Sequence, residues 1–236
     1  MKLMVIHGQY PPEEVEVRRK HVLETASSET KIEFFEIGED IFALSHNADD
    51  ELISMLAGPR LVEKAQEAEK SGFHAVLAYG TLDFGVDAAC SRVEIPVVGM
   101  GRSAFCVAAN VASRIAVIAY QSTMIPNTWK YIRAIGLQGF VTSVRAVDIS
   151  LKHMSAQREI LKEAFIKLAR RAATEEGAEI IVPRGISIVP RYFSAEEISK
   201  EAQIPVIDCV AAGVKTVEMM VSMGMKNSRK VYSRGR

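Results

Sequence analysis

The sequence predicts an α/β protein of two similar halves, each a parallel sheet flanked by helices. Strand-like and helix-like stretches alternate along the 236 residues, which is typical of parallel sheets covered by helices. The stretches 72–89, GFHAVLAYGTLDFGVDAA, and 177–190, GAEIIVPRGISIVP, also share one plan. Each opens with glycine, runs through an apolar strand and reaches a second glycine eight residues on, Gly80 or Gly185. An Ile-Pro-Val segment then follows, at 95–97 or 204–206. We expect one half at 1–99 plus 207–236, the other at 100–206, and a site in the cleft between them.

The individual elements follow from local patterns. Short apolar or alternating runs bounded by polar loops predict strands at 2–7, 31–36, 75–79, 95–99, 114–119 and 204–207, and within 139–147 and 177–190. Longer segments predict helices at 13–25, 48–55, 61–71, 127–135, 156–176, 195–202 and 210–223. A small-residue helix should end at 113, and another should follow Gly85 and include Asp87. The clearest helical period lies in 156–176, where apolar residues recur at three- and four-residue spacing.

Four loops are expected to carry the site. In parallel α/β sheets, ligands bind outside the carboxyl ends of the strands. The loops that follow the strands in this position are 7–10, 80–85, 120–123 and 184–187.

Composition excludes several classes of protein. Lysine plus arginine and aspartate plus glutamate number 29 each, so no net field favours nucleic acid or an anionic membrane. No apolar run approaches the ~20 residues that a membrane-spanning helix needs. The opening MKLMVI is a strand followed by polar residues, not a signal peptide. Three cysteines without CxxC spacing favour a reducing compartment. We expect a cytoplasmic protein that binds neither nucleic acid nor membrane.

Nucleotide- and metal-binding motifs are absent from the sequence. It contains no P-loop, no G-x-G-x-x-G opening a helix, and no H-E-x-x-H or similar metal spacing. We therefore expect no cofactor and no metal.

The stretch 72–89 resembles the hydantoin racemase branch of the aspartate/glutamate/hydantoin racemase superfamily. It matches the branch's pattern G-A-D-A-I-V-I-A-C-F-G-D-P-G-L-D-A-A without a gap, with Asp83, Gly85 and Asp87 in place. Residues 95–105, IPVVGMGRSAF, and 204–215, IPVIDCVAAGVK, look like two further segments of that branch. The resemblance implies the superfamily's fold, cofactor-independent chemistry and a homo-oligomer.

The same resemblance implies reacting groups that this chain lacks. The family uses two facing cysteines, one to remove a proton from Cα and the other to deliver a proton to the opposite face. Here those positions are Gly80 and Gly185, and glycine can neither take nor give a proton. Arg102 also replaces an expected glutamate, and HGQY at 7–10 replaces an asparagine-rich loop. The departures coincide at the expected site while the scaffold motifs persist, which indicates a changed function.

Several side chains in these loops are candidates, each with a structural alternative. The two glycines either satisfy a positive φ or open room for a ligand. Asp83 is a helix cap or a base, and His7 is a satisfied loop histidine or a proton carrier. Arg184 forms a surface ion pair or grips a carboxylate. We assign the proton-transfer candidates as His7, Asp83, Tyr79 and Cys209, the last at a helix N-terminus. The substrate-binding candidates are Gln9, Tyr10, Gly80, Thr81, Ser122, Thr123, Arg184, Gly185 and Ser187.

Three hypotheses follow. The first is a cofactor-independent isomerase, decarboxylase or lyase of this superfamily, which acts on a small, anionic carboxylate or hydantoin-like compound by proton transfer at carbon. The second is a non-catalytic small-molecule binding protein on the same fold. The third is a true hydantoin or amino-acid racemase, whose usual mechanism the two glycines exclude.

Overall fold

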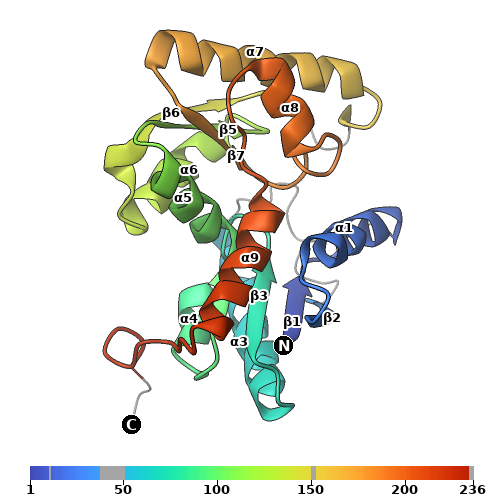
Figure 1. Cartoon of the computed structure of the whole chain (residues 1–236), viewed down its shortest axis with the longest axis vertical. Coiled ribbons are helices and arrows are strands. Elements are labelled where there is room, and N and C mark those ends of the chain that lie inside the picture. Colours follow the sequence, from blue (N-terminus) through green and yellow to red (C-terminus); the bar gives the residue numbers. More distant parts are fainter. Residues whose placement is uncertain (11, 38–50, 150–152, 234–236) are drawn as a thin grey trace. The chain divides into compact units, whose positions relative to one another are not determined.

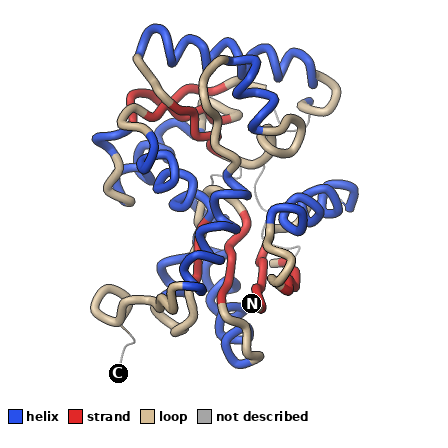
Figure 2. Tube along the Cα trace, viewed as in Figure 1, coloured by secondary structure: helices blue, strands red, loops and turns tan. Residues whose placement is uncertain are grey.

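The structure, a computed structural model, describes residues 1–10, 12–37, 51–149 and 153–233 (Figure 1). The chain divides into two compact units, Met1–Met100 with Gly213–Arg236, and Gly101–Ala212. The divisions fall after Met100 and after Ala212, where the sequence suggested 99 and 206. Both units combine parallel strands with flanking helices, seen as red strands and blue helices in Figure 2.

The first unit contains a parallel sheet in the order β2-β1-β3-β4. Its strands are β1 (Lys2–His7), β2 (Lys31–Glu36), β3 (Ala75–Tyr79) and β4 (Val97–Gly99). Its helices are α1 (Pro12–Thr25), α3 (Glu51–Lys70) and α4 (Val86–Cys90). Helix α3 packs on β1 and β3 and contacts α4. The buried core combines the apolar residues of the central strands with Ile53, Leu61 and Ala65 of α3.

The second unit contains a parallel sheet in the order β6-β5-β7. Its strands are β5 (Ile115–Ala119), β6 (Val141–Ala146) and β7 (Ile180–Arg184), and β5 and β7 are buried throughout. The helices are α5 (Met100–Val111), α6 (Met124–Ala134), α7 (Arg158–Glu176) and α8 (Ala195–Ala202), with a 3-10 turn at Gln138–Phe140. Helix α9 (Cys209–Ser222) begins in this unit, and its residues from Gly213 on belong to the first unit. Helix α7 packs against β5 and β6 and contacts α8 (Figure 1).

Several expected elements differ from the structure. Residues 204–207 make only an isolated bridge between Ile181 and Val206, because Pro205 has no N–H to extend a ladder. The helices expected at 48–55 and 61–71 correspond to the single helix α3, which continues through Gly58 and Pro59. Residues 48–50 of that expectation lie outside the described residues. Helix α6 begins at Met124 rather than 127.

Strand register sets the positions of the candidate loops. In the first unit, His7 at the end of β1 pairs with Tyr79 at the end of β3. In the second unit, Ala119 at the end of β5 pairs with Arg184 at the end of β7. The residues that follow these pairs therefore leave each sheet at its carboxyl edge, where α/β proteins bind ligands.

Candidate functional site

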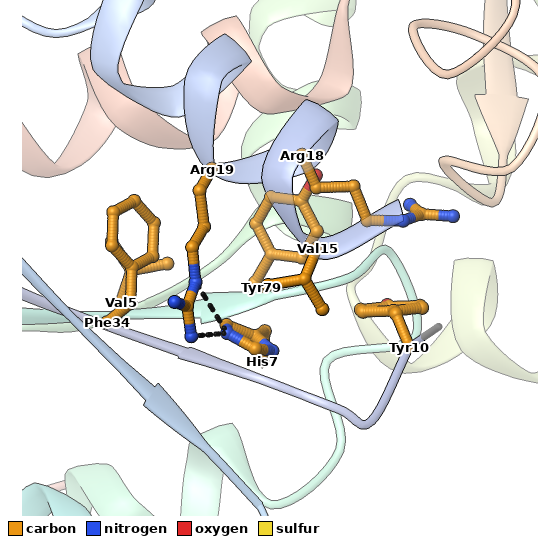
Figure 3. Close-up of a pocket in the computed structure, with 8 residues that line it drawn as sticks. All are labelled: Val5, His7, Tyr10, Val15, Arg18, Arg19, Phe34 and Tyr79. Carbon is orange, nitrogen blue, oxygen red and sulfur yellow. Dashed lines mark hydrogen bonds between the residues drawn. The ribbon is translucent and has the colours of Figure 1, made fainter. Parts of the chain in front are cut away.

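A cluster of aromatic rings and arginines lies where β1 and β3 end. The ring of Tyr10 lies edge-on to Tyr79, with centroids 6.4 Å apart, and 6.1 Å from the ring of His7. Helix α1 adds Arg18 and Arg19 to the cluster (Figure 3). Val5, Val15 and Phe34 complete the lining of a small pocket whose free interior is about the size of one water molecule. The pocket brings together three of the sequence candidates: His7, Tyr10 and Tyr79.

Both ring nitrogens of buried His7 are engaged by protein groups. Nδ1 lies 2.7 Å from the carbonyl oxygen of Gly8, and Nε2 lies 3.0 Å from Nη2 and 3.3 Å from Nε of Arg19. A guanidinium can only donate, so Nε2 accepts and Nδ1–H donates to Gly8. Burial lowers the pKa of His7, outweighing the hydrogen bond to Gly8 that raises it. His7 is therefore a neutral imidazole whose lone pair is directed at Arg19 (Figure 3).

Arg18 is a buried cation that packs on Tyr10. Its side chain is 6% exposed, and its Nη2 lies 2.7 Å from Oε2 of Glu14, one helical turn earlier. The guanidinium carbon lies 4.1 Å from the centre of the Tyr10 ring, within cation–π range. Burial acts to lower the pKa of Arg18, but Tyr10, Tyr79 and Glu14 together raise it. Burial in turn raises the pKa of Tyr10, so its phenol stays protonated near neutral pH.

The loop after β3 contacts the end of β4 and the start of α5. Gly80 has φ +134°, and its N–H donates to Sδ of Met100 over 3.3 Å. Apart from its chain neighbours, no atom described lies within 4 Å of the position where a Cβ would project. Thr81 is buried. Asp83 has φ +53° and packs its carboxylate on Gly99, where an added Cβ would lie 2.3 Å from Cγ of Asp83.

The carboxyl edge of the second sheet carries a buried tyrosine and a buried arginine. Tyr120 and Arg184 are each 3% exposed. The guanidinium carbon of Arg184 lies 4.1 Å from the ring centre of Tyr131 on α6. Gly185 has φ +111°, and a Cβ added to it would lie 2.9 Å from Cε1 and 3.0 Å from Cδ1 of Tyr120. The ring of Tyr120 therefore occupies the space of a side chain at 185.

The other candidates of the second unit occupy varied surroundings. Ser122 and Thr123 are exposed, and the Ser122 N–H donates to Oδ1 of Asp148 over 2.7 Å. Ser187 is half-buried in the turns after β7. Cys209 is fully buried at the start of α9, and its Sγ lies 3.4 Å from the carbonyl oxygen of Pro183 as donor. This contact and burial are typical of a structural thiol.

Within the described residues, no group of three or more His, Cys, Asp or Glu side chains is placed to hold a metal ion. The helices described there also include none long and apolar enough to cross a membrane. Gln9 is half-buried and directly precedes Tyr10, a member of the aromatic and arginine cluster at the ends of β1 and β3.

Sequence reasoning missed the arginines of α1 and the tyrosine after β5. Arg18 lies in a charged helix and gives no local sign of burial, although its i, i+4 relation to Glu14 is visible in the sequence. Tyr120 directly follows an apolar strand and begins the loop 120–123 that the sequence placed at the sheet's edge, but it was not among the candidate side chains. Its contact with Gly185 depends on the pairing of β5 with β7.

A family model and curated relatives match most of this chain. A family model described as Asp/Glu/hydantoin racemase matches residues 39–217. The hydantoin racemase of Pseudomonas sp. (strain NS671) is 29% identical over 184 residues, covering 78% of this chain and 72% of that protein. The hydantoin racemase of Paenarthrobacter aurescens is 25% identical over 177 residues, covering 74% and 73% of the two chains.

Solved structures share the fold. Allantoin racemase from Pseudomonas fluorescens superposes with a TM-score of 0.87 at 22% identity, covering 100% of this chain and 97% of that one. A glycine-to-cysteine mutant of arylmalonate decarboxylase, in a sulfate-associated form, superposes with a TM-score of 0.61 at 13% identity, covering 95% and 94%. At these identities the structural likeness concerns the fold.

Proposed function

Because this chain belongs to the Asp/Glu/hydantoin racemase family, we propose that it is a cofactor-independent enzyme that transfers protons at carbon. The substrate is a small anionic carboxylate or hydantoin-like compound, and the reaction is an isomerisation, a decarboxylation or a lyase step. The family's cysteine positions, Gly80 and Gly185, supply no acid or base, so other groups move the proton.

The observation that carries this proposal is the buried guanidinium of Arg184 at the carboxyl edge of β7. A buried cation there suits an anionic ligand, because charge-assisted hydrogen bonds to a carboxylate are stronger than neutral ones. Its stacking on Tyr131, 4.1 Å away, fixes the plane of the guanidinium. Such a cation also stabilises the negative charge that develops when a carbon next to a carbonyl loses a proton or carbon dioxide.

The phenols of the first unit are the best proton carriers among the candidates there. Tyr79 and Tyr10 lie edge to face beside the cationic Arg18, and a protonated phenol can donate to a carbanion. His7 directs its lone pair at Arg19, and Asp83 packs on Gly99. These two are therefore secondary candidates for the base.

The remaining candidates have binding roles in this proposal. Gly80 leaves open space for a substituent of the substrate, and its loop offers buried Thr81. Gln9, Ser122, Thr123 and Ser187 offer hydrogen bonds to ligand oxygens. Cys209, a thiol hydrogen-bonded to Pro183, is the weakest of the catalytic candidates. We further expect a cytoplasmic homo-oligomer.

Proton NMR in D2O tests the proposal directly. Purified protein would be incubated with amino acids, hydantoins, allantoin and substituted malonates, and each α-proton signal followed. Loss of one signal, or appearance of a new product, identifies the substrate class. A compound that exchanges should then exchange more slowly with Tyr79→Phe than with Tyr232→Phe. The second variant is the matched control because its phenol donates to Asp87 over 3.1 Å, outside the pocket lined by Tyr10 and Tyr79.

The alternative is a binding protein that has kept the ligand site and lost catalysis. Glycine at both positions where the family carries its reacting groups favours it. Titration calorimetry with the same panel distinguishes the two hypotheses. Saturable binding of a compound that shows neither exchange nor product would refute the enzyme and support the binding protein.

A further inference from the structure

Arg19 is a half-buried cation whose described partners are uncharged. Its Nη2 and Nε lie 3.0 and 3.3 Å from Nε2 of His7, and its guanidinium carbon lies 5.1 Å from the centre of the Phe34 ring. Within the described part of the chain no carboxylate pairs with Arg19, including Glu36, which lies opposite His7 on β2. A guanidinium carries five N–H groups, and the lone pair of His7 takes two. Three donors and the positive charge are therefore left for a ligand.

Arg18, the preceding residue of α1, is a useful contrast. Its Nη2 and Nε lie 2.7 and 3.1 Å from Oε2 of Glu14, so a carboxylate balances its charge. Both arginines line the pocket at the ends of β1 and β3, and the lining residues described there include no carboxylate. His7 is a neutral imidazole, because burial lowers its pKa. The pocket thus carries one positive charge that no described lining residue balances, and such a charge favours a bound anion.

The size and walls of the pocket indicate the kind of anion. Its free interior is about the size of one water molecule and opens to solvent, so it accommodates one oxygen of a ligand whose remainder lies in the mouth. Val5, Val15 and the Phe34 ring are apolar lining groups (Figure 3). A planar carboxylate matches the fork of a guanidinium, and burying its carbon substituent against apolar side chains is favourable. A fully hydrated inorganic anion gains nothing from these walls.

We propose that Arg19 binds the carboxylate of a small organic acid in this pocket, with His7 as the neutral acceptor that orients the guanidinium. The residues of the site all belong to the first unit. The inference goes beyond the proposed function, because it concerns binding without a chemical step and holds for an enzyme and for a binding protein alike. The ligand class is a carboxylate with a small apolar substituent.

The test is a titration with sodium propionate at constant ionic strength, followed by the backbone amide NMR signals of residues 8–10. These residues adjoin the pocket, whereas Arg184 belongs to the other unit. We expect saturable shifts in the wild type. In Arg19→Gln the Kd should rise by about 10- to 100-fold, because the charge-assisted hydrogen bonds to the carboxylate are lost.

Lys20→Gln is the matched control. It removes the same charge one residue later on α1, from a side chain that is 71% exposed and lies 3.7 Å from Glu24. Exposed charges are screened by salt, so the Kd of this variant should stay within about twofold of the wild-type value.

A second variant keeps Arg19 and changes its partner. His7→Glu places a carboxylate where the neutral imidazole accepts from the guanidinium, and the Kd for propionate should therefore rise as in Arg19→Gln. Circular dichroism verifies that each variant is folded. Unchanged propionate binding in His7→Glu would show that the unbalanced charge does not hold the anion, and so refute the inference.

The outcomes separate this inference from the proposed function. Saturable binding that is weakened in Arg19→Gln and kept in Lys20→Gln supports the site. No saturable shift in the wild type overturns it, and so does equal weakening by the two variants, which reduces the effect to general charge attraction. Tighter binding of sodium sulfate than of propionate at the same ionic strength overturns the assignment to a carboxylate. A negative titration leaves the D2O test of the proposed function standing, and a negative D2O test leaves this site standing.

Discussion

Gly185 and Gly80 form a matched pair for testing how tightly the second unit's edge is packed. Both have positive φ, +111° and +134°, so alanine strains the backbone at either position. Their surroundings differ. A Cβ at 185 meets the Tyr120 ring at 2.9 Å, whereas at 80 the described chain leaves 4 Å of open space, its immediate neighbours aside. Gly185→Ala should therefore be the more destabilising substitution.

The expected difference follows from two costs. Holding a residue with a side chain in a sparsely populated φ region costs about 1–3 kcal/mol, and both variants bear this cost. Forcing an extra carbon into a packed contact adds about 1–3 kcal/mol, and only Gly185→Ala bears it. For a chain of this size, the extra cost lowers Tm by a further 2–12 °C or so.

Thermal and urea unfolding followed by circular dichroism would measure both variants beside the wild type. The same Gly185→Ala change in a Tyr120→Ala background removes the clash and isolates the coupling between the two residues. In that background its cost should fall to the backbone strain alone. Equal destabilisation by Gly185→Ala and Gly80→Ala, or an unchanged cost in the Tyr120→Ala background, would refute the packing argument.

Three further predictions concern charges. Arg184→Lys should weaken ligand binding, measured by calorimetry, by about 10- to 100-fold, because a planar charge-assisted contact worth ~1.5–3 kcal/mol is lost. Arg133→Lys, at an exposed position, should leave the binding affinity unchanged. Glu218→Ala should lower the free energy of unfolding by about 1–3 kcal/mol, because Glu218 accepts hydrogen bonds from the Thr30 hydroxyl and from the Ser27 N–H. Lys215→Ala, which removes the ion pair of exposed Lys215 with Glu218, should lower it by under about 1 kcal/mol. The pKa of His7 is lowered in the folded protein. As the pH falls, the unfolded chain therefore takes up a proton on His7 before the folded chain does, so wild-type stability should fall as the pH drops below about 6.5. His7→Gln should lose less stability over that range in urea titrations at successive pH values, and an identical pH dependence of the two proteins would contradict the burial of a neutral His7.

The positive φ of both glycines was available from the sequence, because a glycine that ends an apolar strand is the residue that turns most freely. The sequence alone could not show whether each glycine also opens space for a ligand. Gly80 has open space and Gly185 is covered by Tyr120, a difference set by which strand lies next to β7. The sequence likewise placed His7 at the end of a strand. It could not show that Arg19, on the following helix α1, contacts Nε2 of His7.

The sequence by itself determined the α/β class, most of the strands and helices, and the loops at the strand ends. The spacing of apolar residues and the glycines that end strands are local properties of the chain. The resemblance read from the sequence also predicts that Gly80 and Gly185 stand at the family's cysteine positions, and this stays a prediction. Only the tertiary structure decided which side chains share an environment. Arg18 is a buried cation that packs on Tyr10, the Asp83 carboxylate packs on Gly99, and the Tyr120 ring covers Gly185. The last two contacts depend on the parallel pairing of β3 with β4 and of β5 with β7. Such register follows from the packing of the whole sheet rather than from any one segment.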